Sequence, residues 1–361
     1  MSFGITPAQS AIVDAIGRIC AKYDDAFWLG CDNDHRFPEE FVRDIAAGGY
    51  LGIAMPEAHG GAGLGVTEAA LMMHRIASSG AGMAGVSAVH INIFGPHPIA
   101  VFGSEAQKAR ILPPLIRGET RCCFGVTEPD AGLDTASLKT RAERSGNQWL
   151  VNGRKMWTTT AQSATHILLL ARTSPKGKKP TDGLSLFYTT LDRAHVEVRE
   201  IAKMGRHAID TNMLFIDNLP VPADDLVGEE GKGFDYLLHA FNPERILIAA
   251  EAIGIGQDAL QVRGGGEHLL PFRDLGMRCG RRNHSNHHRG SHKKSALKRN
   301  ALLAMLRMQH FPPLGKGVAN IRPGLPFKKH KAPGIELAVI GHPHGDVQNF
   351  GNLRWIRPGQ P

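Results

Sequence analysis

The sequence lacks any run of about 18 consecutive apolar residues, the length that a helix needs to cross a bilayer. We therefore expect no membrane span. Its first residues also lack the basic segment followed by an apolar segment that marks a secretory signal peptide. No CxxC pair and no regular spacing relate the five cysteines, which are Cys20, Cys31, Cys122, Cys123 and Cys279. This pattern predicts reduced thiols in a cytoplasmic protein rather than a disulfide framework or a zinc site.

Acidic residues are scarce in one part of the chain only. Residues 261–361 hold 18 Lys and Arg against 4 Asp and Glu, whereas residues 1–260 hold 24 against 30. The net charge of +8 therefore arises from the last part, which also contains 9 of the 18 histidines, 14 glycines and 9 prolines. The length of 361 residues and the hydrophobic content of 42% predict two or three folded domains and exclude a wholly disordered chain.

Hydrophobic periodicity divides residues 1–260 into three parts. Apolar residues spaced by three and four predict helices at 7–23, 38–47, 67–78 and 104–116, the last with Ser104 as its N-cap. Short β-rich runs predict an antiparallel β-barrel or sandwich from strands at 122–127, 148–152, 165–171, 184–189, 196–201 and 213–216. Asn152-Gly153 is typical of a hairpin turn. A helical period returns over 233–260, where residues 246–255 are apolar nearly all round and predict deep burial.

The predicted fold class is α+β. It comprises an N-terminal helical domain (1–118), a middle antiparallel β domain (119–228), the start of a C-terminal helical domain (229–260) and an atypical basic tail (261–361). The segments after Leu260 carry Gly and Pro where long amphipathic helices are needed to cover the last helix. We therefore expect the C-terminal helical domain to be incomplete.

Two motifs in the β domain offer surfaces for a planar ligand. Residues 124–134 (FGVTEPDAGLD) leave a strand at Glu128-Pro129, because proline keeps the preceding residue extended. Backbone N–H groups at such a strand end are free to bind a heterocycle, and Thr127 adds a hydroxyl donor. Trp157 ends another strand, offers a rigid stacking surface and precedes three threonines. The structural alternatives are a plain β-turn with a buried threonine and a core tryptophan.

The motifs 124–134 and 153–159 (GRKMWTT) stand in a fixed order with five other segments. These are 55–63 (MPEAHGGAG), 102–107 (FGSEAQ), 112–119 (LPPLIRGE), 203–206 (KMGR) and 221–228 (VPADDLVG). In this order and spacing, the chain resembles the acyl-CoA dehydrogenase family of flavoproteins over about residues 5–260. Several ordered segments are a far more specific match than one short motif.

The resemblance implies FAD as the cofactor. Its isoalloxazine ring is expected against the first motif and the tryptophan motif, at Phe124, Val126, Thr127, Trp157, Thr158 and Thr159. One departure is visible, because the family usually has a serine where this chain has Leu133. Leucine cannot offer a hydroxyl to the cofactor phosphates or to a thioester, so one polar contact is lost or is supplied by another group.

The resemblance also implies a catalytic base at Glu244, with Asn242 and Arg245 as residues that bind the CoA part of the substrate. Some branches of the family carry their base at this position, whereas most carry it in a C-terminal segment far downstream. The alternative is purely structural, since Asn242 as N-cap, Pro243 at N1 and Glu244 in the first turn are good helix-start chemistry. Glu251 lies about 10 Å further along the helix, and we interpret it as structural.

The tail, residues 261–361, matches none of the elements with which the family continues. Three interpretations compete: a frameshift near Gln261, a genuine basic tail that binds nucleic acid or acidic lipid, and a metal site at His284, His287, His288 and His292. Few aromatic residues accompany the basic ones, and the histidines stand among Lys and Arg without Cys or Asp partners. We therefore favour the frameshift and expect neither nucleic acid nor metal.

The function implied by the resemblance is dehydrogenation of an acyl-CoA thioester in fatty acid metabolism. A glutamate removes the α-proton, a hydride passes to FAD N5, and the electrons continue to an electron-transfer flavoprotein. The family also implies a homodimer or homotetramer. An acyl-CoA oxidase remains open. The alternative from another class is an inactive flavin- or CoA-binding remnant whose basic tail binds an anionic partner.

Overall fold

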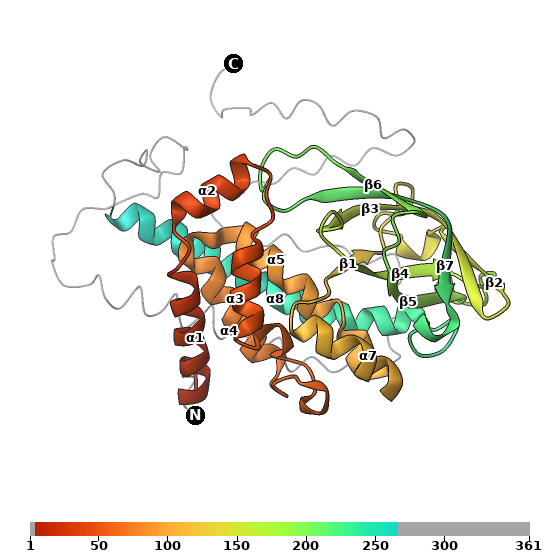
Figure 1. Cartoon of the computed structure of the whole chain (residues 1–361), viewed down its shortest axis with the longest axis horizontal. Coiled ribbons are helices and arrows are strands. Elements are labelled where there is room, and N and C mark those ends of the chain that lie inside the picture. Colours follow the sequence, from red (N-terminus) through yellow and green to blue (C-terminus); the bar gives the residue numbers. More distant parts are fainter. Residues whose placement is uncertain (1–3, 266–361) are drawn as a thin grey trace, which may run out of the picture. The chain divides into compact units, whose positions relative to one another are not determined.

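The computed structural model describes residues 4–265, in which a group of helices precedes a curled sheet and one long final helix (Figure 1). The helices before the sheet are α1 (Pro7–Cys20), α2 (Asp25–Asn33), α3 (Glu39–Ala47), α4 (Val66–Ile76), α5 (Gly82–Phe94), α6 (His97–Phe102) and α7 (Glu105–Ile116). The expected α+β class and the helical N-terminal part are confirmed. The periodic pattern did not identify α2, α5 or α6 as separate helices.

Local sequence explains where these helices begin. Thr6 caps α1 in a capping box with Gln9, and Ser104 caps α7 in the same way with Gln107. The expected N-cap at Ser104 is therefore confirmed. Hydrophobic periodicity did not predict helix α5, because every residue from 85 to 94 is buried. The helix therefore has no polar face to alternate with an apolar one.

The sheet contains seven strands in the order β1-β4-β2-β3-β7-β6, with β5 paired to β4. They are β1 (Cys122–Gly125), β2 (Arg141–Ser145), β3 (Gln148–Thr159), β4 (His166–Arg172), β5 (Leu184–Thr190), β6 (Val196–Glu200) and β7 (Thr211–Pro222). The expectation of a purely antiparallel sheet is wrong, because β4 runs parallel to β1 and contacts β2 in parallel at one residue pair. Strand β2 was missed because its side chains are polar and mostly exposed.

The hairpin between β2 and β3 turns at Gly146, which has the left-handed φ of 61° that favours glycine. The turn expected at Asn152-Gly153 is wrong. Those residues lie inside the twelve-residue strand β3, at a register shift opposite β7. Such a shift inserts an irregularity into the ladder without ending the strand.

The last described helix, α8 (Gly233–Gly265), is continuous and contains Pro243 in its interior. The expected helix start at Asn242 is therefore wrong. The residues from 233 onward already form the helix, so Asn242 caps nothing, and its Oδ1 instead accepts a hydrogen bond from Arg245 Nη1 at 3.2 Å. Proline in a helix interior removes one backbone hydrogen bond and normally bends the helix.

Helix α8 packs against α4, α5, α6 and β5 (Figure 1). Gly254 permits the close approach to α4, since a Cβ there would lie 2.6 Å from the His74 carbonyl oxygen. Leu247 and Ala250 are buried in the helical core, whereas Ile248 is 42% exposed and Leu260 is 67% exposed. The expectation that this helix is buried all round is therefore wrong for the residues described here.

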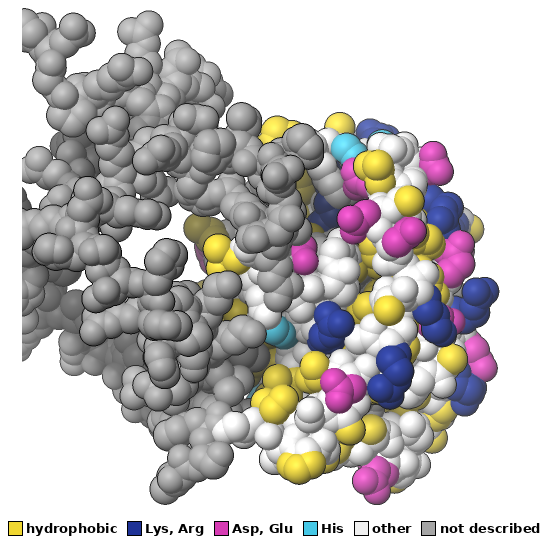
Figure 2. Space-filling view, turned by 90° about the vertical axis from the view of Figure 1, so that its left-hand side faces the viewer, with side chains coloured by type: hydrophobic (Ala, Val, Ile, Leu, Met, Phe, Trp, Pro, Cys, Tyr) yellow, Lys and Arg dark blue, Asp and Glu magenta, His cyan; other side chains and the backbone are white. Residues whose placement is uncertain are grey.

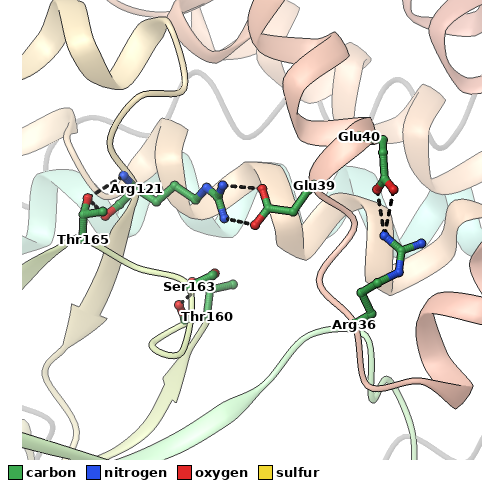
Figure 3. Close-up of polar contacts among 7 residues, drawn as sticks. All are labelled: Arg36, Glu39, Glu40, Arg121, Thr160, Ser163 and Thr165. Atoms are coloured by element: carbon green, nitrogen blue, oxygen red, sulfur yellow. Dashed lines mark hydrogen bonds and ion pairs between the residues drawn. The ribbon is translucent and has the colours of Figure 1, made fainter. Parts of the chain in front are cut away.

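Polar contacts join the helical part to the first strand. The Arg121 guanidinium, just before β1, forms two hydrogen bonds with the Glu39 carboxylate at the start of α3 (Figure 3). The backbone N–H of Arg121 donates to Thr165 Oγ1 at 3.0 Å, and Thr165 directly precedes β4. These contacts fix the entry to β1 relative to both α3 and β4.

Cys20, Cys31, Cys122 and Cys123 are free and buried, whereas Cys279 and the histidine cluster of the tail lie outside residues 4–265. Within that range no three His, Cys, Asp or Glu side chains are placed to hold a metal ion. None of the described helices is long and apolar enough to cross a membrane. On the face shown in Figure 2, acidic and basic side chains of the described residues are interspersed.

Candidate functional site

A buried lysine holds the segment that follows β1. Lys155, on β3, is completely buried, and its Nζ donates to the carbonyl oxygens of Val126 (3.2 Å) and Leu170 (2.7 Å). The same Nζ lies 2.9 Å from Glu128 Oε1. One ammonium group therefore ties together the exit of β1, the strand β4 and the glutamate of the first motif.

Glu128 completes this arrangement from the other side. Its carboxylate accepts the backbone N–H groups of Lys139 (2.6 Å) and Thr140 (2.9 Å). Burial raises the pKa of Glu128, but Lys155 and these donors outweigh it, so the net pKa lies below the usual range. Burial lowers the pKa of Lys155 to about 8, and Glu128 opposes that shift. Lys155 and Glu128 thus form a buried, hydrogen-bonded pair that holds the loop after β1.

Trp157 follows this lysine on β3 and lies at the surface. Its side chain is 55% exposed and its backbone has a φ of +62°, which is rare for a bulky residue. The Met156 N–H donates to the Thr127 carbonyl at 2.8 Å, so the two motifs meet here. Strained backbone of this kind clusters at functional sites. The alternative of a core tryptophan does not apply, and Thr127 is only half-buried.

The threonines after Trp157 differ in their surroundings. Thr158 is buried, and its Oγ1 has no hydrogen-bond partner among residues 4–265. Its carbonyl accepts from Asn212 Nδ2 at 3.0 Å. Thr159 is half-buried, and its carbonyl accepts from Thr160 Oγ1 at 2.7 Å. Of these two expected cofactor-binding threonines, only Thr159 is therefore partly accessible.

An aromatic contact brings α8 to the end of β1. The ring of Phe124, on β1, lies 6.1 Å from that of Phe241 on α8 and 5.7 Å from that of Phe94 on α5. Glu244 follows Phe241 by three residues, which is about one helical turn. The expected base and the expected cofactor-binding motif, more than 100 residues apart in the sequence, thus lie near each other.

Glu244 is half-buried, and burial raises the pKa of its carboxyl. His90 and Arg245 lower that pKa in part, whereas Glu251 raises it further. Arg245 and Asn242 are exposed and contact each other, and the Arg245 guanidinium lies 5.6 Å from the centre of the Phe241 ring. All three residues expected from the resemblance thus lie on one stretch of α8, with the carboxyl the least exposed to water.

Several residues of this region had no role predicted from the sequence. Lys155 and Glu128 stood inside the quoted motifs, but nothing in the sequence showed that they pair. His90 was a lone histidine in an apolar run, and its Nδ1 lies 2.8 Å from Glu251 Oε1. Leu133, the departure from the family pattern, is fully exposed.

Comparison with known families agrees with this geometry. The model of the acyl-CoA dehydrogenase N-terminal domain matches residues 6–119, and that of the middle domain matches residues 123–219. An acyl-CoA dehydrogenase of Bacillus subtilis (strain 168) is 33% identical over 246 residues, which is 68% of this chain and 62% of that protein. The acyl-CoA dehydrogenase FadE12 of Mycobacterium tuberculosis (strain ATCC 25618 / H37Rv) is 31% identical over 272 residues, which is 72% of this chain and 66% of that protein.

Solved structures give the same result. A glutaryl-coenzyme A dehydrogenase in complex with glutaryl-CoA is 29% identical with a TM-score of 0.68, covering 75% of this chain and 69% of its own. An acyl-CoA dehydrogenase from Geobacillus kaustophilus is 26% identical with a TM-score of 0.68, covering 83% of this chain and 76% of its own. The chain spans slightly less than two thirds of the length of the two curated relatives named above. The chain belongs to the acyl-CoA dehydrogenase family.

Proposed function

We propose that this protein catalyses flavin-dependent α,β-dehydrogenation of an acyl-CoA thioester, with Glu244 as the base. The observation that carries the proposal is the packing of Phe241, about one helical turn before the half-buried Glu244 on α8, against Phe124 of β1. Helix α8 would supply the base, and the β domain would supply the surface for the planar flavin ring. This is the arrangement that removal of two hydrogens from adjacent carbons requires.

The proton chemistry follows from the environment of Glu244. A thioester α-proton is far less acidic than a carboxylic acid, so an ordinary carboxylate removes it poorly. Burial raises the pKa of Glu244 and so makes it a stronger base. Arg245, exposed beside it, suits the anionic phosphates of the CoA part through charge-assisted hydrogen bonds.

The residues present fit FAD as the cofactor. The held backbone at Val126 and Thr127 offers a fixed edge, and the exposed Trp157 indole offers a stacking surface. FAD supplies the acceptor for the hydride when it is bound. A glutaryl-CoA dehydrogenase from Mycobacterium smegmatis solved in complex with FADH2 is 25% identical to this chain. That similarity supports the same cofactor here.

We also propose the electron acceptor and the assembly expected for the family, an electron-transfer flavoprotein and a homodimer or homotetramer. An oxidase is the second candidate function, because a prolyl acyl carrier protein oxidase is also a structural neighbour, at 25% identity and a TM-score of 0.67. Formation of hydrogen peroxide in air-saturated buffer without any added acceptor distinguishes the oxidase from the dehydrogenase.

We also propose that the activity of this chain is impaired. Ile248 and Leu260 are exposed on α8, and the composition changes near residue 261. Exposing a large aliphatic side chain forgoes about 1.5–3 kcal/mol of burial, so several such residues weaken a marginally stable domain. Low solubility, weak FAD retention and slow turnover are the expected consequences.

The direct test is product analysis. The purified protein, supplied with FAD and an artificial electron acceptor, is incubated with octanoyl-CoA, and the products are examined by mass spectrometry. We expect a thioester lighter by two hydrogens from the wild type and none from Glu244→Gln. The matched control is Glu229→Gln, which makes the same change at an exposed residue just before α8 and should leave product formation intact. Equal product from wild type and Glu244→Gln contradicts the assignment of the base.

A further inference from the structure

A polar group lies inside the apolar core of the helical part, two turns along α8 from Glu244. Glu251 is completely buried, and its Oε1 lies 2.8 Å from His90 Nδ1 on α5. Its other oxygen, Oε2, is also buried and has no hydrogen-bond partner in the part of the chain described. A buried polar oxygen without a hydrogen-bond partner is costly, so it marks a position that a further polar group would satisfy.

A second polar contact borders this pair. Arg206, in the connection between β6 and β7, donates from Nη1 to the buried Ser87 Oγ at 2.9 Å. Ser87 lies three residues before His90, so both side chains lie on one face of α5. Burial lowers the pKa of Arg206, and the nearby Glu251 opposes this shift. We call Ser87, His90, Arg206 and Glu251 the α5–α8 polar cluster.

The cluster lies in line with the proposed base. Seven residues separate Glu244 from Glu251, which returns to nearly the same face of α8 about 10 Å further along the axis. His90 and Glu251 both influence the pKa of Glu244, so the two positions are within electrostatic range. The His90 side chain keeps 10% of its surface accessible, and Glu244 is only half-buried. A molecule that meets Glu244 and extends along this face of α8 is directed towards His90, the member of this pair that keeps an accessible surface.

We propose that the α5–α8 polar cluster binds the far end of the acyl group, and that this end carries a hydrogen-bond donor such as a hydroxyl or an amide N–H. The inference rests on the proposed function, because it assumes that the α-carbon lies at Glu244. Glu251 Oε2 has no partner among the described residues, and a hydroxyl or an amide N–H at the end of the acyl chain supplies one. A methyl-terminated chain leaves this oxygen unpaired, and sites built to bind a substrate hydroxyl discriminate strongly against analogues that lack it.

The test compares two thioesters that differ in one group. Octanoyl-CoA and its ω-hydroxy counterpart are titrated into the full-length protein by calorimetry, so that the readout is the Kd and needs no turnover. We expect the ω-hydroxy thioester to bind about 10- to 100-fold more tightly to the wild type. In Glu251→Leu this preference should disappear, whereas Asp258→Leu, which also replaces a carboxylate by leucine further along α8, should retain it.

The outcomes separate the inference from the proposed function. Equal Kd values for the two thioesters in the wild type, or tighter binding of octanoyl-CoA, overturn the inference alone and leave the dehydrogenase proposal standing. Binding of neither thioester contradicts both. Should Glu251→Leu fail to fold, Glu251→Gln serves in its place. Its amide keeps an acceptor and is expected to retain part of the preference, and a preference unchanged from wild type in this variant also counts against the inference.

Discussion

Substituting Lys155 with methionine should strongly destabilise the protein. The change leaves the buried Glu128 carboxylate without its cation and leaves the Val126 and Leu170 carbonyls without a donor. Breaking a buried ion pair by removing one partner typically costs about 3–5 kcal/mol. The two backbone amides that still bind Glu128 limit the loss of stability, whereas the two carbonyls left without a donor add to it. These effects oppose each other, so we expect a loss within that range. A loss of this size is a large share of a typical domain's stability.

The assay is urea unfolding of the full-length protein, followed by tryptophan fluorescence. The matched control is Arg117→Met, which removes the cation of an exposed ion pair with Glu119 and should leave the free energy of unfolding near that of the wild type. The double variant Lys155→Met/Glu128→Gln should regain part of the loss, because no buried charge remains uncompensated. The reasoning is refuted if Lys155→Met unfolds at the same urea concentration as Arg117→Met.

Four further predictions follow from the same geometry. Trp157→Ala should lower the FAD retained through purification while Trp157→Phe keeps most of it, and unchanged FAD content in Trp157→Ala counts against the stacking role. Because burial raises the pKa of Glu244, the rate of flavin reduction by an acyl-CoA should rise with pH through a value above the usual 4.3 or so for glutamate. A flat profile contradicts this. Because the folded-state pKa of Glu128 is lowered, its contribution to stability is present above its ordinary pKa and is lost as pH falls below it. The midpoint of urea unfolding should therefore depend less on pH below about 4 in Glu128→Gln than in the wild type, and parallel profiles refute this. Replacing residues 261–361 by the corresponding segment of the Bacillus subtilis relative should raise FAD content and turnover, and equal values in both proteins refute impairment by the tail.

The sequence predicted elements well where a local pattern determines them. Ser104 identified the start of α7, because an N-cap hydrogen bond is a contact within one turn, and the structure adds Gln107 as its partner. Helix α5 gave no such pattern, since burial on all sides removes the amphipathic period. The helix start at Asn242 was wrong because the local rules for asparagine and proline were satisfied, although the preceding residues were already helical.

The candidate site was predictable only in part, for a physical reason. The segments that carry Thr127 and Trp157 were identified from their order along the chain. The pairing of Lys155 with Glu128 spans 27 residues, and that of His90 with Glu251 spans 161. Contacts at such separations depend on how strands and helices pack, and no spacing rule along one element describes them. The left-handed backbone of Trp157 likewise appears only in three dimensions.

The central claim is that Glu244 removes a proton from an acyl-CoA held against a flavin. The most direct measurement is the visible absorbance of the FAD-loaded protein after anaerobic addition of octanoyl-CoA, recorded for the wild type and for Glu244→Gln. Our account predicts that the yellow colour of the wild type fades, and that Glu244→Gln binds the same amount of FAD and stays yellow. A wild type that keeps its colour, or a Glu244→Gln variant that fades at the same rate, contradicts it.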